Sequence, residues 1–160
     1  MENYLMLNGK RIDLTEEQIK TLGFEVKKDY FERGGEYFYI TPQGYVTNDF
    51  ESNGCLTSDC RYKVGNYCTD ENFMKQRALY ETLDRLLWRF SMQNDGDKID
   101  WDNDCRKYSI YYDYSVNKFI VEYYMHVKKQ ETYFYSRETA QRAIDEIIIP
   151  FMKEHPEFVW

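Results

Sequence analysis

Short runs of β-prone residues, each closed by a turn signal, recur along this chain. Asn8-Gly9 supplies the positive φ angles of a type I′ turn, and Pro42 and Gly44 fit the corners of a type I turn, so the flanking runs predict antiparallel hairpins. The predicted strand pairs are residues 4–7 with 10–14, 37–40 with 45–47, and 108–112 with 118–124. A third strand is predicted beside each of the last two pairs, at residues 61–68 and 132–135, and the polar residues 48–60 are predicted to form a loop.

Other segments repeat their apolar residues with the period of a helix. Thr15 and Gln18 have the spacing of a capping box and precede a short helix. Thr69 is the predicted N-cap of the longest helix, Ser136 is the predicted N-cap of a helix over residues 137–149, and Pro150 is expected to end or kink that helix. The apolar faces of these two helices are Leu79, Leu83, Leu86, Leu87 and Phe90 in the first, and Ala140, Ala143, Ile144, Ile147 and Ile148 in the second.

The order of these elements is the same in two parts of the chain. Residues 36–94 and residues 105–152 each follow a strand–strand–strand–helix pattern, and residues 1–35 add an N-terminal hairpin and a short helix. A length of 160 residues fits one domain. We therefore predict a single α+β domain in which helices pack on antiparallel sheet.

Charge and aromatic content narrow the classes of partner. The chain has 28 acidic and 21 basic residues, a net charge of -7, and this balance repels bare nucleic acid and anionic membranes. It also has 16 Tyr, 10 Phe and 3 Trp, which are more aromatic side chains than a core of this size needs. Surface tyrosine is common at protein–protein interfaces. With no apolar leader and no long apolar run, we expect a protein of the cytosol that does not enter membranes.

A run of aspartates follows the longest predicted helix. It contains Asp95, Asp97, Asp100, Asp102 and Asp104. An EF-hand loop with its glycine at Gly96 would need acidic ligands at Ser91 and Gln93, which are poor substitutes and fall within the predicted helix. We therefore favour a solvated loop over a calcium site and keep an acidic binding surface as a third interpretation.

The cysteines and histidines do not form a motif with a known chemistry. The four cysteines are Cys55, Cys60, Cys68 and Cys105. They lack the Cys-x-x-Cys spacing of a zinc knuckle, although the first three would meet in space if the loop before the longest helix folds back. Neither His126 nor His155 is tied to a cysteine by sequence, so a Cys–His enzyme is not indicated. We predict no enzyme activity and no cofactor.

Aromatic residues are the strongest binding candidates. Trp88 lies about 180° from Leu79 on an ideal helix and shares the polar face with Asp84, so it is either an interface anchor or covered by a further layer. Tyrosines lie on both faces of the hairpin at residues 108–124. Either one face is exposed and prone to bind a partner, or both faces are packed against other parts of the chain. They are Tyr111, Tyr112, Tyr114, Tyr123 and Tyr124.

Several segments resemble a family of short uncharacterised proteins carried by phages and prophages of gut Firmicutes. The similar segments are LTEEQIKTLGFEV, FERGGEYFYITPQGYV, RYKVGNYCTDENFMKQRAL and YFYSRETAQRAI. The most typical element is the step from residue 65 to residue 69, GNYCT, in which family members often have Phe at the position of Cys68. These motifs match strand ends and helix caps, so the resemblance implies a biological context more than an activity.

Small acidic phage proteins include many anti-defence factors, notably anti-CRISPR proteins, which act by stoichiometric binding. By analogy with them, we predict an inhibitor that occludes a basic nucleic-acid groove on a host defence nuclease. The predicted partner-binding residues are Asp95, Asp97, Asp100, Asp102, Asp104, Trp88, Tyr111 and Tyr112. The alternative is a nucleic-acid-binding accessory domain that stacks bases on exposed aromatics, and its only basic candidates are Lys27, Lys28, Arg61, Lys63, Lys128 and Lys129. A sticky aromatic face also allows a homodimer.

Overall fold

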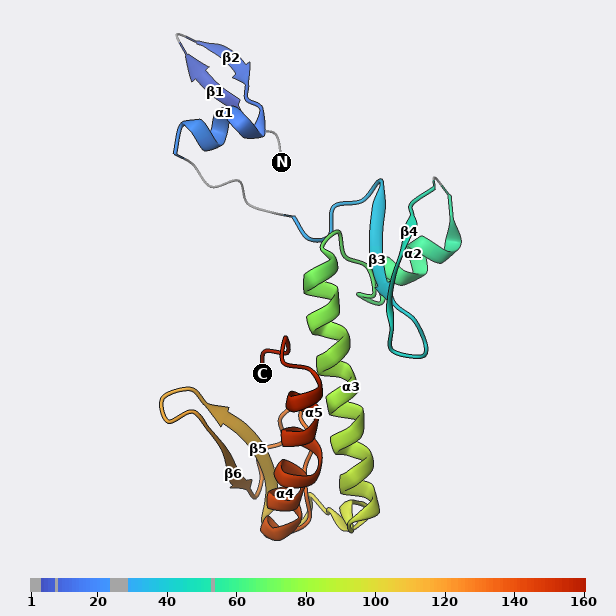
Figure 1. The fold of residues 1–160 in the computed structure, drawn as a ribbon, viewed down its shortest axis with the longest axis vertical. Helices are drawn as coiled ribbons and strands as arrows, with labels where there is room; N and C mark the ends of the chain where they lie inside the picture. The colour runs from blue at the N-terminus through green and yellow to red at the C-terminus, as the bar shows by residue number, and fades with distance from the viewer. Residues whose placement is uncertain (1–3, 8, 24–28, 53) are drawn as a thin grey trace.

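The computed structural model describes residues 4–7, 9–23, 29–52 and 54–160. Within them the chain is α+β, as predicted, with three separate two-stranded antiparallel sheets and a long central helix. This helix, α3 (Glu71–Gln93), runs along the longest axis of the molecule (Figure 1). Figure 1 shows one hairpin beside the N-terminal end of α3, and another hairpin with the last helices beside its C-terminal half.

The N-terminal hairpin and short helix are confirmed. Strands β1 (Tyr4–Leu7) and β2 (Lys10–Asp13) pair in antiparallel register, and Gly9 has a φ angle of 78°. Asn8, the other half of the predicted turn, lies outside the described residues. Helix α1 (Glu16–Thr21) begins with the predicted capping box, in which the Gln18 backbone donates to the Thr15 hydroxyl and the Thr15 backbone donates to the Gln18 side chain.

The second hairpin is also confirmed, but the segment after it is not. Strands β3 (Glu36–Ile40) and β4 (Val46–Phe50) pair as expected. The predicted loop at 48–60 and the predicted strand at 61–68 are wrong, because helix α2 (Leu56–Lys63) crosses the boundary between them. Cys55 caps this helix without a side-chain hydrogen bond, and Ser58 is its only buried residue. Neither a polar cap nor an apolar stripe therefore marks α2 in the sequence.

Two residues supply the edge pairing that a third strand was predicted to make. Cys68 exchanges two backbone hydrogen bonds with Phe38 of β3, at 2.7 and 3.0 Å. The Asn66 side chain pairs with the backbone of Ile40, accepting from its N–H at 2.7 Å and donating to its carbonyl at 2.8 Å. A side-chain amide thus replaces one peptide group of a strand neighbour.

The N-cap of α3 is one residue later than predicted. Asp70 accepts a hydrogen bond from the Phe73 backbone N–H at 2.9 Å, and its φ and ψ angles are extended. The Thr69 hydroxyl instead donates to the carbonyl of Asp29 at 3.2 Å. Both residue types are good caps, and an acidic side chain at this end is further favoured by the helix dipole.

The third hairpin is confirmed, as strands β5 (Lys107–Asp113) and β6 (Lys118–Tyr124). The strand predicted at 132–135 is reduced to a single bridge between Phe134 and Tyr108. Ser136 caps α4 (Arg137–Ala143), as expected, by accepting from the Thr139 backbone N–H at 3.1 Å.

The last helix does not end at Pro150. It continues through a π turn, η2 (Ile144–Ile148), into α5 (Ile149–Glu154), with Pro150 in the first turn of α5. Proline has no N–H for the carbonyl four residues earlier, and the π turn directly before it is where the hydrogen-bond register of the helix changes.

The core has two unequal parts. The larger part joins the C-terminal half of α3 to β6, the Phe134 segment and the last helices, and includes the predicted apolar faces of both long helices. Its buried members are Leu83, Leu87, Phe90, Val121, Phe134, Ala140, Ala143, Ile144, Ile148, Phe151 and Phe158. The smaller part lies between β3 and the start of α3 and has Ile40, Cys68, Met74 and Ala78.

Candidate partner-binding surface

Three exposed aromatic rings lie along one side of helix α3, from Tyr80 at the edge of its core-facing stripe to Trp88 on its polar face. Phe73 is 48% exposed, Tyr80 is 50% exposed and Trp88 is 60% exposed. The spacings of seven and eight residues place these side chains within about 80° of one another around the helix axis. Because no described segment buries Trp88, this indole is a solvent-facing aromatic, as an interface anchor requires.

Basic residues on the neighbouring surface of α3 are paired within the helix. Arg77 Nε lies 2.9 Å from one oxygen of Glu81, and an Arg85 guanidinium nitrogen lies 2.8 Å from the other. The Glu81–Arg85 pair joins residues four positions apart on the helix. A single glutamate holds both arginines, and neither pairs with Asp84 on the next turn.

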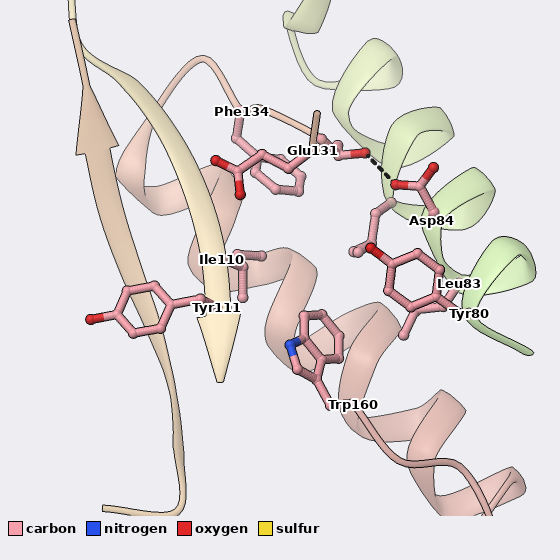
Figure 2. Close-up of a pocket in the computed structure, with 10 residues that line it drawn as sticks. Tyr80, Leu83, Asp84, Ile110, Tyr111, Glu131, Phe134 and Trp160 are labelled. Carbon is pink, nitrogen blue, oxygen red and sulfur yellow. Dashed lines mark hydrogen bonds between the residues drawn. The ribbon is translucent and has the colours of Figure 1, made fainter. Parts of the chain in front are cut away.

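A groove opens beside this face, between α3 and the third hairpin (Figure 2). It has a volume of about 190 Å³, and its lining comes from four segments that are far apart in sequence. The lining residues are Tyr80, Leu83, Asp84, Leu87, Ile110, Tyr111, Glu131, Thr132, Phe134 and Trp160. Two of them are acidic and none is basic.

Figure 2 shows how these side chains divide the groove. Trp160 lies toward one end, and Asp84 and Glu131 lie toward the other, with the Asp84 carboxylate next to Tyr80 on α3 and the Glu131 carboxylate on the side of the hairpin. The Thr132 hydroxyl donates to Asp84 at 3.2 Å, which joins the segment after β6 to α3. The groove therefore has an aromatic end and an anionic end.

Neither predicted hairpin tyrosine points its ring freely into this groove. The ring of Tyr111 is directed away from α3 while Ile110 faces it, since neighbouring strand residues alternate between faces (Figure 2). Tyr112 is half-buried and packs edge-to-face against Tyr114 and Phe119, with ring centroids 5.0 and 4.9 Å away. Tyr111 remains an exposed aromatic of the hairpin, whereas Tyr112 is largely used for packing within the chain.

The five predicted aspartates lie in the segment after α3 and all are exposed. Asp95, in the left-handed conformation at φ 65°, precedes the 3₁₀ turn η1 (Gly96–Lys98) and forms an ion pair with Lys98 at 2.6 Å. Asp104 lies 3.4 Å from His126. Asp100 holds the loop, because it accepts from the Asp102 backbone at 2.9 Å and from the Asn103 side chain at 3.0 Å.

Within the described residues, the remaining two carboxylates, of Asp97 and Asp102, accept no hydrogen bond and form no ion pair. The five aspartates are thus not equivalent: three take part in local structure and two face solvent alone.

A buried lysine organises the end of this loop. Lys107 is 2% exposed, and its ammonium donates to the Asn103 carbonyl at 2.7 Å, to the Asn103 side chain at 3.1 Å and to the Met125 carbonyl at 3.2 Å. Both Lys107 and Lys128 also lie within 5.6 Å of the centre of the Trp101 ring. These positive charges offset part of the negative field of the aspartates.

A network of charged and phenolic groups fills the space around the second hairpin. The Arg33 guanidinium bonds Glu51 and Asp59, and an Arg61 nitrogen lies 2.8 Å from Asp49 and 2.6 Å from the Tyr37 hydroxyl. Arg33 lowers the pKa of Glu51 chiefly by this hydrogen bond, and Arg61 lowers that of Asp49 in the same way.

The phenols of this network are poor acids. Burial, followed by the hydrogen bond to Glu51, raises the pKa of Tyr67 to about 12. Its ring stacks on that of Tyr37, with centroids 4.3 Å apart. Because the half-buried Arg61 guanidinium also lies 3.4 Å above the Tyr39 ring, it is already engaged by partners within the protein and is poorly placed to bind a nucleic-acid phosphate.

The cysteines have separate environments. Cys68 is buried, Cys55 is half-buried, and Cys60 and Cys105 are exposed. Among the described residues, no three His, Cys, Asp or Glu side chains converge in a way that could hold a metal ion. The backbone N–H groups of Ser58 and Thr57 at the start of α2 are directed toward the Cys55 sulfur and lower the pKa of its thiol, but the described residues place no histidine beside it.

In the part of the chain that the structure describes, no helix is both long and apolar enough to cross a membrane. The prediction from sequence missed the groove, because Glu131 and Trp160 come to α3 only through the folding of distant segments. Of the lining residues, Tyr80 could have been predicted from the sequence, because it lies eight positions before Trp88 on the same predicted helix.

Comparisons of the chain with protein-family models, with curated proteins and with solved structures give no match.

Proposed function

We propose that this protein is a stoichiometric binding inhibitor that covers a basic surface of a host defence nuclease, as anti-CRISPR proteins do. The observation that carries the proposal is the exposed aromatic face of α3, with Trp88 and Tyr80 beside a groove rimmed by Asp84 and Glu131. Aromatic anchors surrounded by charge are the typical composition of a binding hot spot and its rim.

The charge of the chain supports a basic partner. A net charge of -7 steers association toward a positive surface, such as the groove in which a nuclease holds nucleic acid. The aspartate loop contributes to this steering through Asp97 and Asp102, whose carboxylates are not used within the described structure. The anchoring role belongs to α3, because Lys98, Lys107 and Lys128 lie close to the loop and offset its charge.

The test of the anchor is a titration of purified CRISPR nucleases in a DNA-cleavage assay. Inhibition is expected to saturate at one inhibitor per nuclease, and Trp88→Ala is expected to weaken binding by roughly 30-fold, because hot-spot residues contribute about 2 kcal/mol or more. Tyr45→Ala is the matched control, since Tyr45 is 74% exposed and lies in the turn of the second hairpin. Equal losses from both variants would contradict the anchoring role of Trp88.

The test of charge uses the two free aspartates. Asp97→Asn with Asp102→Asn removes two charges and keeps the loop hydrogen bonds of Asp100, so it is expected to slow association at low salt. Glu138→Gln with Asp145→Asn removes the same charge from the α4 and η2 surfaces and serves as the control. Association that is independent of both variants and of salt would argue against electrostatic steering.

A further inference from the structure

The groove between α3 and the third hairpin combines features that suit one kind of side chain. Its aromatic end has Trp160, its anionic end has Asp84 and Glu131, and Tyr80 lies next to Asp84 (Figure 2). We propose that this groove is a receptor for a single arginine side chain of the protein partner. The inference rests on the proposed function for the identity of that partner, but the groove can be tested without it.

The size of the groove fits one side chain. Its volume is about 190 Å³. A protein cavity of roughly 150 Å³ accommodates a benzene molecule, so this groove takes a group of about that bulk and not a helix or a strand. Its floor is apolar, with Leu83, Leu87 and Phe134 buried in the core, and suits the methylene stem of a long side chain.

Within the described residues, the carboxylates of Asp84 and Glu131 form no ion pair with an arginine or a lysine. Arg77 and Arg85 on the same helix are both held by Glu81. Lys129 is close to Glu131 in sequence but directs its ammonium to the Tyr124 hydroxyl. The pKa of Lys129 is raised first by this hydrogen bond and to a smaller extent by the charge of Glu131. Asp84 has one neutral hydrogen-bond donor, the Thr132 hydroxyl. Two carboxylates without a paired cation at one groove favour a positively charged occupant.

An arginine satisfies both ends of the groove, whereas an apolar or acidic side chain does not. Its planar guanidinium can lie against an aromatic ring and donate hydrogen bonds to a carboxylate at the same time. An apolar occupant would strip water from the carboxylates without replacing the lost hydrogen bonds. The chemistry of the lining therefore selects a cation over a hydrophobic residue.

The experiment is an NMR titration of the full chain with a peptide, acetyl-Gly-Arg-Gly-amide, and with its neutral citrulline counterpart. The indole N–H of Trp160 is assigned with a Trp160→Phe variant. Binding of the arginine peptide is expected to be weak, on the order of millimolar, and to shift the Trp160 and Tyr80 signals in a saturable way. The citrulline peptide is expected to leave them in place.

Charge-removing variants complete the test. Asp84→Asn with Glu131→Gln keeps the size of both side chains and is expected to weaken arginine-peptide binding at least about fivefold. Glu138→Gln with Asp145→Asn, which lie outside the groove, is the control of equal charge. Equal shifts with the citrulline peptide, no saturable shift at Trp160, or unchanged binding in the groove variant would each overturn the proposal.

The two proposals fail separately. If the arginine peptide binds but no nuclease is inhibited, the groove inference stands and the proposed function does not. If the wild type and the Asp84→Asn, Glu131→Gln variant inhibit a nuclease equally, and the arginine peptide shifts no NMR signal, the groove inference fails while the proposed function stands. Spectral dispersion in the same NMR experiment confirms that each variant is folded.

Discussion

The two hairpin–helix units of this protein share a backbone plan and differ in what stabilises them. In the first unit Cys68 bridges Phe38 and the helix cap follows at Asp70; in the second, Phe134 bridges Tyr108 and the cap follows at Ser136. The bridge lies two residues before the cap in both units, and a buried tyrosine precedes each bridge. The one-residue correction of the first cap thus makes the equivalence closer than the sequence suggested.

The same plan encloses different interiors. Around the β3–β4 hairpin of the first unit, the core has four buried members and is supplemented by ion pairs of Arg33 and Arg61 with carboxylates. Around the β5–β6 hairpin of the second unit, eleven buried residues, three of them from α3, form an apolar core. The two units thus repeat the same hydrogen-bond register and capping but differ in the source of their stability. The larger core also supplies the floor of the groove, with Leu83 and Leu87 from α3 and Phe134 from the second unit.

The largest expected change in stability comes from substituting the buried bridge residues of the two units, Phe134 and Cys68. Phe134→Ala, at a side chain 1% exposed, is expected to lower the free energy of unfolding by about 3–5 kcal/mol. Cys68→Ala, at a side chain 0% exposed, is expected to lower it by only about 1 kcal/mol, because a single heavy atom is lost from a small core. Urea unfolding measures both, and a loss of only about 1 kcal/mol for Phe134→Ala would contradict its place in the larger core.

A smaller effect tests the equivalence of the caps. Asp70→Ala and Ser136→Ala are each expected to lower the free energy of unfolding by about 1 kcal/mol, because each leaves a helix N–H without its acceptor. Thermal or urea unfolding measures the change. A larger loss for Thr69→Ala than for Asp70→Ala would restore the cap predicted from sequence and shift the two units out of register.

The smallest expected effect concerns the response to acid, which should separate the charged unit from the apolar one. Arg33 lowers the folded-state pKa of Glu51, so the stabilisation from this pair is present above the ordinary glutamate pKa of about 4.3 and is lost as the pH falls through the lower folded-state value. Glu51→Gln is expected to flatten the loss of stability below pH 4.3, as followed by urea unfolding at several pH values. An unchanged acid slope would show that Glu51 does not link the first unit to pH.

The sequence predicted the local elements well where their signals are local. The capping box at Thr15, the cap at Ser136 and both apolar helix faces depend on residues a few positions apart, and the structure confirms them. Helix α2 was missed because its stability comes from distant partners: Arg61 reaches Asp49 on β4, and Asp59 binds Arg33.

The candidate site was predicted less completely, for the same physical reason. The exposure of Trp88 follows from its position on an amphipathic helix, and the exposed aspartates follow from a polar turn. The groove could not be predicted, because the residues that line it with Tyr80 come from the third hairpin, from the segment before the bridge at Phe134 and from Trp160. Burial of Lys107 under the aspartate loop also has no local pattern.

Hydroxyl-radical footprinting tests most directly whether this protein binds a nuclease through the α3 face, as we propose. Side-chain oxidation is measured by mass spectrometry in the free protein and in its complex with an inhibited CRISPR nuclease. Trp88 and Tyr80 are expected to be strongly protected in the complex, with oxidation of the exposed Tyr45 unchanged. Protection of Tyr45 with Trp88 still fully oxidised would place the interface on the first unit and contradict the account.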